Sequence, residues 1–311
     1  MKDSKELKEN NFVRLPYFDW DKAKDFYYVA KLGSFSEAGK FLNISQSSLS
    51  RKIKILEDHL NCRLFTRLPH GLEITRKGEE LYAIIERTFL DLKGFNYNAA
   101  VTTNDGQKRK IRVSTTHPVS AYILSEHLIS YNFLHPEIIL EIIAEDRLID
   151  LSINDVDIAI RPYESNIKGI EQELLFTLKK KLFASIPYLD KNGEPTSIED
   201  LKYHPVISHP QAERYPYSDL NWILKLGMSE EEIKTPIFSS NSLETAVAAA
   251  QRGIGILGSY EQMSLIRQSK LKNILPNIFS TPVEWYYVYP NFLNKDVYIL
   301  GMLNYLKGQI S

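Results

Sequence analysis

Residues 43–54 read Asn-Ile-Ser-Gln-Ser-Ser-Leu-Ser-Arg-Lys-Ile-Lys. Across this stretch and just beyond it, apolar side chains recur at i, i+4, i+7 and i+11, namely at Leu49, Ile53, Leu56 and Leu60. That spacing predicts a helix with one continuous apolar stripe. Asn43 and Ile44 predict a tight turn before the helix, and Ser45 is placed to cap its first turn.

The face opposite the apolar stripe carries polar side chains and no acid: Gln46, Ser47, Ser50, Arg51 and Lys54. Arginine bonds bidentately to guanine edges, glutamine to adenine, and serine to base edges or phosphates. A polar, solvated face is also an ordinary property of any amphipathic surface helix. Taken alone, this strip is compatible with two interpretations, a helix that contacts DNA bases and an ordinary surface helix.

The residues before this helix predict two more helices. From Asp21 apolar residues recur at three- and four-residue spacing, and Gly33 stands where that helix would end. Ser36 is placed to cap a short second helix that turns Ala38 and Phe41 inward. Two helices, a tight turn and a polar third helix together describe a helix-turn-helix.

A hairpin and a long helix are predicted after it. Residues 64–67 and 72–75 form two short strand patterns around Pro-His-Gly, which indicates a wing that presents Arg67 and His70 to DNA. Thr75 is placed to cap a helix that ends near Gly94, with an apolar stripe at Leu81, Ile85, Phe89 and Leu92. Only one side of this helix is apolar, so we expect it to pair with its own copy.

Composition and charge agree with two joined parts. The 311 residues favour about two domains, and their net charge of −1 hides an excess of five basic residues in 14–78 and of six acidic residues in 79–311. The single cysteine, Cys62, excludes an internal disulfide and a cysteine-cluster zinc site. The sequence has no long uncharged apolar run and no secretory signal pattern, so we expect a cytoplasmic protein that makes no contact with a membrane.

The remaining two thirds alternate strand and helix patterns, which predicts parallel α/β sheets. The strand patterns lie at 111–114, 138–143, 156–160, 181–186, 206–207, 237–238, 255–257 and 285–289, and the helical patterns at 120–133, 147–153 and 243–251.

Polar residues follow the predicted strands, where open α/β sheets bind ligands. They are Thr115, Thr116 and His117, then Arg161, then Ser208 and His209, and then Ser240, Asn241 and Ser242. Hydroxyls, amides and an arginine near a helix N-terminus suit a small anion, although each residue alone is equally explained as a cap. The sequence shows no spacing typical of a metal site, a catalytic triad or a phosphate loop, and Gly253–Gly258 has strand and helix in the wrong order for a dinucleotide fingerprint. We therefore expect neither enzyme activity nor a metal or other cofactor.

The N-terminal residues closely resemble LysR-type transcriptional regulators. The resemblance rests on three stretches at the family's spacing. They are Phe-Ser-Glu-Ala at 35–38, residues 43–51, and a set further on that comprises Leu64-Phe65, Arg67, Gly71-Leu72, Thr75 and Gly78. Ser47 stands where the family usually has proline and Gly39 where it usually has alanine. The Thr-Thr-His run is similar to the sulfur-metabolism branch of the family.

The resemblance implies an α/β chain with an N-terminal all-α winged helix-turn-helix and an effector domain of two Rossmann-like lobes, similar to type II periplasmic binding proteins. The implied parts are an extension (1–17), the DNA-binding domain (18–76), a dimerising linker helix (77–95), a hinge (96–110), and an effector domain (111–311) whose first lobe spans 111–163 and 276–311 and whose second spans 164–270.

The implied function is sequence-specific binding of duplex DNA at an imperfect inverted repeat, controlled by a small effector between the lobes. Ser34, Ser36, Ser45 and Arg67 would contact the DNA backbone. A dimer through the linker helix, a tetramer, and RNA polymerase as a further partner are expected on the same ground. Two alternatives stay open: a small-molecule-binding protein or enzyme whose basic N-terminal unit serves assembly, and a constitutive regulator without inducer.

Overall fold

The computed structural model describes residues 18–68, 71–103, 108–146, 151, 156–162, 169–210, 220–229 and 232–310. These residues fall into two compact units, Met1–Thr88 and Phe89–Ser311. No helix in the described ranges has the length and apolar character needed to cross a membrane. The expected N-terminal extension, His70 and most of the expected helix at 147–153 lie outside the described residues.

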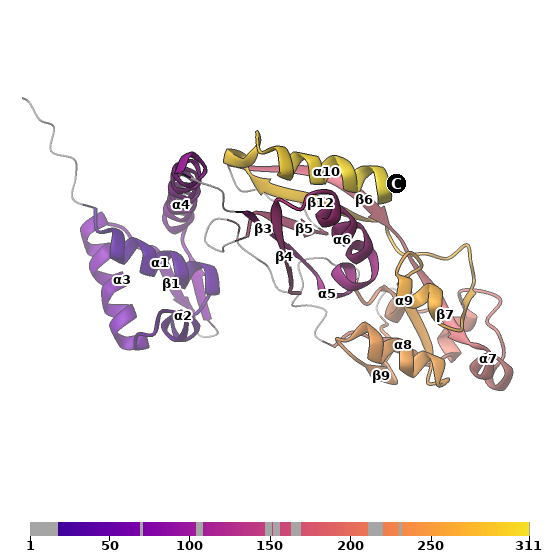
Figure 1. Cartoon of the computed structure of the whole chain (residues 1–311). Coiled ribbons are helices and arrows are strands. Elements are labelled where there is room, and N and C mark those ends of the chain that lie inside the picture. The colour runs from indigo at the N-terminus through magenta and orange to yellow at the C-terminus, as the bar shows by residue number, and fades with distance from the viewer. Residues whose placement is uncertain are drawn as a thin grey trace, which may run out of the picture. The chain divides into compact units, whose positions relative to one another are not determined.

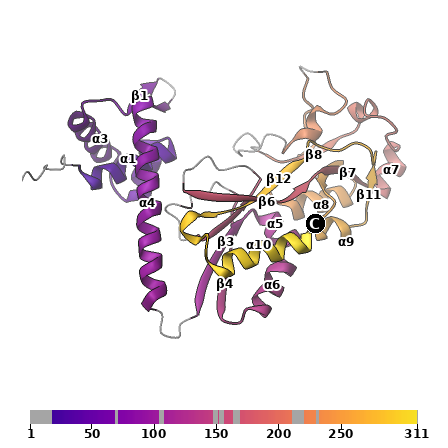
Figure 2. The same ribbon diagram turned by 90° about the horizontal axis from the view of Figure 1, so that it is seen from above.

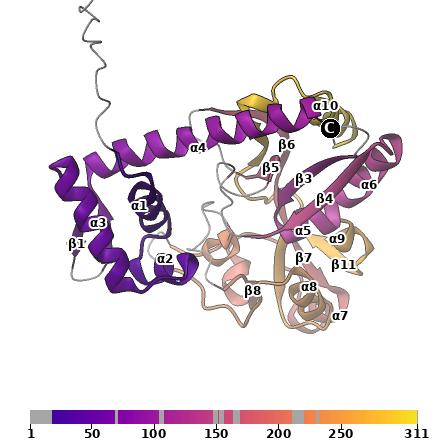
Figure 3. The same ribbon diagram turned by 60° about the vertical axis from the view of Figure 1, so that its left-hand side comes forward.

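The first unit holds three helices and a two-stranded hairpin, followed by the start of a long helix (Figure 3). The elements are α1 (Trp20–Leu32), α2 (Phe35–Leu42), α3 (Gln46–Leu60), β1 (Phe65–Leu68) and β2 (Gly71–Ile74). β1 and β2 are antiparallel, with Phe65 opposite Ile74. Their core includes Phe26 and Leu49, both fully buried. The helix-turn-helix with a wing is therefore present as predicted.

The helix ends follow the predicted residues with one exception. Gly33 (φ 63°) and Asn43 (φ 60°) adopt the left-handed conformation that ends α1 and α2. Ser45 caps α3 by accepting a hydrogen bond from Ser48 N at 3.2 Å. The prediction that Ser36 caps α2 is wrong. Ser34 has the extended backbone of a cap and accepts from the amide three residues later, so the helix starts at Phe35.

The long helix α4 (Arg76–Thr103) is one continuous helix (Figure 2) and runs beyond Gly94 into the expected hinge. The prediction that the helix ends near Gly94 is wrong: Gly94 lies within it, where an added Cβ would lie 3.1 Å from Phe292, so the glycine permits close packing. The predicted partner-facing stripe is exposed only in part. Leu92 is exposed as expected, but Ile85 is buried within its own chain, and Ile84 and Phe95, which the predicted stripe left out, are exposed.

The second unit contains two five-stranded sheets with helices packed on them (Figure 1). The first sheet has the order β4-β3-β5-β12-β6. Its elements are β3 (Arg109–Thr115), α5 (His117–Val119), η1 (Ser120–Leu124), α6 (Ser125–Leu134), β4 (Ile138–Ala144), β5 (Ile158–Arg161), β6 (Ile170–Leu178), β12 (Val283–Pro290), η5 (Asn291–Leu293) and α10 (Val297–Ile310).

The second sheet has the order β11-β7-β10-β8-β9. Its elements are β7 (Lys180–Ser185), α7 (Ile186–Asn192), η2 (Asp200–Tyr203), β8 (Val206–Ser208), η4 (Trp222–Lys225), β9 (Phe238–Ser239), α8 (Leu243–Gln251), β10 (Ile256–Tyr260), α9 (Ser264–Gln268) and β11 (Leu271–Ile274). Both sheets mix parallel pairs, such as β3 with β4 and β8 with β10, with antiparallel ones.

The division into lobes differs from the expected one at β6. This strand was assigned to the second lobe, but it pairs antiparallel with β12 from Ile170 to Leu178 and so belongs to the first sheet. The chain then passes directly into the second sheet at Lys180. There Lys180 and Ser280 exchange two hydrogen bonds of 3.0 Å, which join the two crossing segments to each other.

Candidate nucleic-acid interface and ligand cavity

The polar strip of α3 lies on the surface of the first unit. Gln46, Ser47, Arg51 and Lys54 are exposed and Ser50 is half-buried. On the opposite side of the same helix the apolar stripe is buried, with exposed fractions of 0% for Leu49, 2% for Ile53 and 1% for Leu56. The buried stripe fixes the rotation of α3 about its axis, so the acid-free strip faces solvent.

Hydrogen bonds join the start of α3 to α2. Ser36 Oγ donates to Gln46 Oε1 at 3.2 Å, and Ser45 Oγ lies 3.1 Å from Ser47 Oγ. Ser34 accepts from Glu37 N at 3.4 Å as the cap of α2. The predicted backbone-contacting serines and the first predicted base-contacting residues therefore form one continuous polar surface.

Glu57 fastens the wing to α3, and sequence analysis missed it. The residue is 8% exposed, and its carboxylate accepts hydrogen bonds from Leu64 N at 2.8 Å, Phe65 N at 3.2 Å and Arg63 Nη1 at 2.8 Å. These bonds hold the first strand of the hairpin against the helix. Arg67 lies in β1, but its side chain is outside the described part of the structure.

A cavity of about 130 Å³ lies between the two lobes of the second unit. Six of the nine predicted ligand residues line it: Thr116, Ser208, His209, Ser240, Asn241 and Ser242. They come from the carboxyl ends of β3, β8 and β9 and from the start of α8. The carboxyl ends of parallel strands meet at one edge of a sheet, so residues distant in sequence converge there.

The other three predicted residues do not line the cavity. Thr115 is fully buried at the end of β3, and His117 is exposed beside the cavity mouth. Arg161 is 3% exposed and donates to Ser114 Oγ at 2.8 Å inside the first lobe. It stays inside because β12 runs beside β5, with Tyr286 opposite Arg161, so this strand end does not open onto the cavity.

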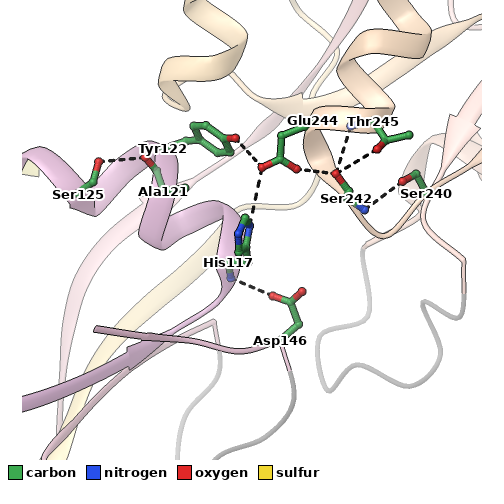
Figure 4. A network of polar contacts seen from close by, with 9 residues as sticks. All are labelled: His117, Ala121, Tyr122, Ser125, Asp146, Ser240, Ser242, Glu244 and Thr245. Carbon is green, nitrogen blue, oxygen red and sulfur yellow. Dashed lines mark hydrogen bonds and ion pairs between the residues drawn. The ribbon is translucent and has the colours of Figure 1, made fainter. Parts of the chain in front are cut away.

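Polar contacts at the mouth of the cavity join the two lobes (Figure 4). Glu244, on α8 of the second lobe, accepts from Tyr122 OH of the first lobe at 2.5 Å and lies 3.9 Å from His117 Nδ1. Its other oxygen accepts from Ser242 Oγ at 2.6 Å. On the other side of His117, its backbone N donates to Asp146 Oδ1 at 3.1 Å. One direct hydrogen bond, from Tyr122 to Glu244, therefore joins the lobes beside the cavity.

These contacts change the acidities of two groups. The hydrogen bond to Glu244, followed by burial, raises the pKa of Tyr122 to about 12. Burial alone would raise the pKa of Glu244, but hydrogen bonds from Ser242 and Tyr122 outweigh it and hold that pKa below its ordinary value. Glu244 is therefore a carboxylate at neutral pH, and Tyr122 is its neutral donor.

Three buried residues of the cavity wall were not predicted: Lys180, Tyr260 and Trp285, with exposed fractions of 4%, 8% and 3%. Trp285 lies on β12, which belongs to the first lobe, and Lys180 and Tyr260 are opposite each other where β7 meets β10. The sequence analysis placed Trp285 in a predicted strand at 285–289 and left Lys180 and Tyr260 just outside the predicted strands at 181–186 and 255–257. Within the described ranges, no group of three histidine, cysteine or acidic residues could hold a metal ion.

Two family models match the chain. One is described as "Bacterial regulatory helix-turn-helix protein, lysR family" and matches residues 20–79. The other is described as "LysR substrate binding domain" and matches residues 104–307. Together they cover the units that carry the α3 strip and the cavity.

Curated relatives and solved structures agree with these two family-model matches. The HTH-type transcriptional regulator CrgA of Neisseria meningitidis (serogroup C, strain 8013) is 26% identical over 231 residues, which cover 74% of this chain and 76% of CrgA. The transcriptional activator AmpR of Providencia stuartii is 27% identical over 227 residues, 73% of this chain and 74% of AmpR. A solved structure of CrgA matches 95% of this chain and 100% of its own chain, at 23% identity and a TM-score of 0.57. The crystal structure of ArgP from Mycobacterium tuberculosis matches 95% of this chain and 98% of its own chain, at 18% identity and a TM-score of 0.58. These last two likenesses concern the fold.

Proposed function

The chain belongs to the LysR family of DNA-binding transcriptional regulators, and from that premise we propose which of its residues bind DNA and which bind the effector. The observation that carries the DNA-binding part is the exposed, acid-free strip of α3 above a fully buried stripe. α3 lies in a major groove, with Gln46, Ser47, Ser50, Arg51 and Lys54 at base edges or nearby phosphates. Ser34, Ser36, Ser45 and Arg67 bind the phosphate backbone and fix the position of the helix.

Arg51 tests this assignment. The Arg51→Ala variant should bind about 1–3 kcal/mol more weakly to a duplex that the wild-type protein has selected from a random pool, and should discriminate less between that duplex and a scrambled one. Arg51→Lys keeps the charge but loses the planar fork, so it should retain non-specific affinity while discrimination falls. Arg267→Ala, an exposed arginine on α9, makes the same change in net charge and serves as the control. Unchanged discrimination by Arg51→Ala in gel-shift titrations would refute the assignment.

A second copy of the chain pairs along α4. Three apolar side chains of that helix, Ile84, Leu92 and Phe95, have exposed fractions of 62%, 55% and 71%. Their positions along the helix place them on the same side of it. Burying such a row against its own copy removes it from water. The dimer then presents two recognition helices to an imperfect inverted repeat with half-sites about one helical turn apart. A pair of dimers forms the tetramer, which works on DNA in the cytoplasm and contacts RNA polymerase.

A small effector binds in the cavity between the lobes. Six of the predicted residues supply its polar lining, and the contact of Tyr122 with Glu244 lies at its mouth. A ligand that contacts both lobes changes the balance between two arrangements of the assembly only if it binds one of them more tightly. A binding molecule should raise the melting temperature of the protein and alter its affinity for the selected duplex.

A further inference from the structure

A hollow of about 570 Å³ lies within the first unit, between α2, α3 and the wing. Ser50 and Lys54 line it and also belong to the acid-free strip of α3, so the hollow borders that strip. Two exposed residues of the wing segment, Arg63 and Thr66, line it as well. The sequence analysis assigned neither of them to DNA. The rest of the lining consists of Phe35, Ile53, Glu57 and Phe65.

The hollow lies where a helix seated in DNA meets the edge of the groove. An α-helix with its side chains is about 10–12 Å across and the major groove is about 12 Å wide, so such a helix fills the groove. A segment packed beside that helix therefore lies over the sugar-phosphate strand at the edge of the groove. β1 is packed beside α3, because Glu57 of α3 accepts hydrogen bonds from the backbone of Leu64 and Phe65. Phosphates are thus the part of the duplex that reaches the hollow.

The lining of the hollow has a net positive charge. Lys54 and Arg63 contribute two positive charges, and Glu57 contributes one negative charge. Lys54 is exposed, and its side chain forms no hydrogen bond or ion pair with any residue that the structure describes. Glu73 is opposite Thr66 on β2, but it does not line the hollow. A singly charged phosphate is therefore stabilised by this lining.

Arg63 is held in place, although only one of its donors is engaged. Its Nη1 donates to Glu57 Oε2 at 2.8 Å, and its backbone carbonyl accepts from Thr75 Oγ1 at 2.7 Å. The Arg63 side chain is 70% exposed. A guanidinium has five N–H donors, and the bond to Glu57 is the one side-chain bond of Arg63 within the described ranges. The planar fork of arginine matches a phosphate, and a side chain already held in position loses little conformational freedom on binding.

We infer that the hollow binds phosphates at the edge of the major groove, with Arg63 and Lys54 as its two cationic contacts. Arg63 is then a DNA-binding residue in addition to those proposed above, and Lys54 contacts phosphate rather than a base. This inference rests on the proposed placement of α3 in a major groove. Phosphates are alike at every base pair, so both contacts add affinity without adding sequence preference.

Salt dependence distinguishes a phosphate contact from a base contact. Each phosphate contact adds about 0.9 to the steepness with which log K falls against log salt concentration. Arg63→Gln and Lys54→Gln, made in the full-length protein, are titrated with the selected and the scrambled duplex at several salt concentrations. Each variant should reduce the slope by about 0.9 per protomer on the DNA, which amounts to about an eightfold loss of affinity at about 0.1 M salt relative to about 1 M. The loss should be equal for the two duplexes, so discrimination between them stays at its wild-type value.

Two further variants serve as controls. Arg63→Lys keeps the positive charge but alters the geometry of the bond to Glu57, as Arg63→Gln does, so it should keep the wild-type slope. Arg252→Gln changes an exposed arginine that follows α8 in the second unit, makes the same change in net charge, and should also leave the slope unchanged. Lys54 has no bond to lose, so Lys54→Gln tests the hollow even if Arg63→Gln does not fold. A wild-type slope in a folded glutamine variant would overturn the inference, as would equal losses in Arg63→Gln and Arg63→Lys.

Discrimination separates this inference from the proposed function. If Arg51→Ala loses discrimination while both glutamine variants keep the wild-type slope, α3 contacts bases as proposed and the hollow binds no phosphate. If the glutamine variants lose slope while Arg51→Ala discriminates as the wild-type protein does, the hollow binds phosphates and the proposed base contact of Arg51 fails. A loss of discrimination in Arg63→Gln would make Arg63 a base-contacting residue and overturn its assignment to phosphate.

Discussion

Replacing Gly78 by alanine should destabilise the wing, although helix propensity alone predicts the opposite. Gly78 lies in the first turn of α4, where alanine is favoured over glycine by about 1 kcal/mol. An added Cβ, however, would lie well inside van der Waals contact with the Leu64 carbonyl oxygen and 2.6 Å from Ile74 Cγ1. That carbonyl is backbone and already accepts from Thr75 N at 2.9 Å, so relief requires the strand and the helix to separate.

The expected size follows from these contacts. Overpacking costs about 1–3 kcal/mol, and weakening the Thr75 to Leu64 hydrogen bond costs about 1 kcal/mol more. After subtracting the helix-propensity gain of about 1 kcal/mol, the net loss in free energy of local unfolding is about 2 kcal/mol. A loss of that size accelerates amide exchange in the hairpin about thirtyfold.

Hydrogen–deuterium exchange of the full-length protein, followed by mass spectrometry, measures this directly. Peptides covering β1 and β2 should exchange faster in Gly78→Ala, while peptides from the second unit provide an internal reference. Gly308→Ala is the matched control, because a side chain at that position of α10 meets nothing within 4 Å and should leave exchange unchanged or slower. Hairpin exchange in Gly78→Ala that is as slow as in the wild-type protein would refute the packing argument.

Three further outcomes are expected. Glu57→Ala leaves two buried amides of the wing without an acceptor and should lower the free energy of unfolding of the first unit by about 2–4 kcal/mol, measured by urea titration. Glu57→Gln retains one acceptor oxygen and should lower it by less than half as much. Equal losses in the two variants would contradict this. Tyr122→Phe removes the hydrogen bond to Glu244 between the lobes and should lower the melting temperature of the second unit by about 2–4 °C, and an unchanged melting temperature would show that this contact contributes nothing. Burial, and then the charge of Lys234, lowers the pKa of His204 below its ordinary value of 6.5, so the unfolded chain binds the extra proton first. The stabilisation that comes from keeping His204 neutral is complete above 6.5, the pKa of this residue in the unfolded chain, and is lost as the pH falls from 6.5 towards its pKa in the folded protein. His204→Asn should flatten this part of the plot of melting temperature against pH, and an unaltered plot would rule His204 out as its source.

The elements that the sequence predicted correctly have strong local patterns. The apolar stripe of α3, the cap at Ser45 and the turn at Asn43 all depend on residues within a few positions of each other. The helix α10 was not predicted, because apolar side chains occupy most of its circumference, so the buried stripe of Ile299, Met302, Leu303 and Leu306 does not stand out in the sequence. The strand β6 was not predicted either, since its position depends on pairing with β12 more than a hundred residues later.

The residues of the cavity likewise divide into those that sequence rules predicted and those that only contacts between distant segments placed there. Ser208, His209 and Ser240 could be predicted because residues at the carboxyl ends of parallel strands meet at one edge of a sheet. Arg161 follows the same rule in sequence but lies inside the first lobe, because β12 pairs alongside β5. Lys180 lies just before the strand predicted at 181–186 and Trp285 lies in the strand predicted at 285–289, and the crossing of the chain between the sheets places both against the cavity.

The sequence by itself determined the exposed, acid-free strip of α3, since the direction of each side chain on a helix follows from its spacing along the chain. Tertiary structure alone decided which buried residues face the cavity, where α4 continues past Gly94, and which lobe contains β6. Those features depend on contacts between segments far apart in sequence, and local periodicity carries no information about which distant strand or helix a segment will meet.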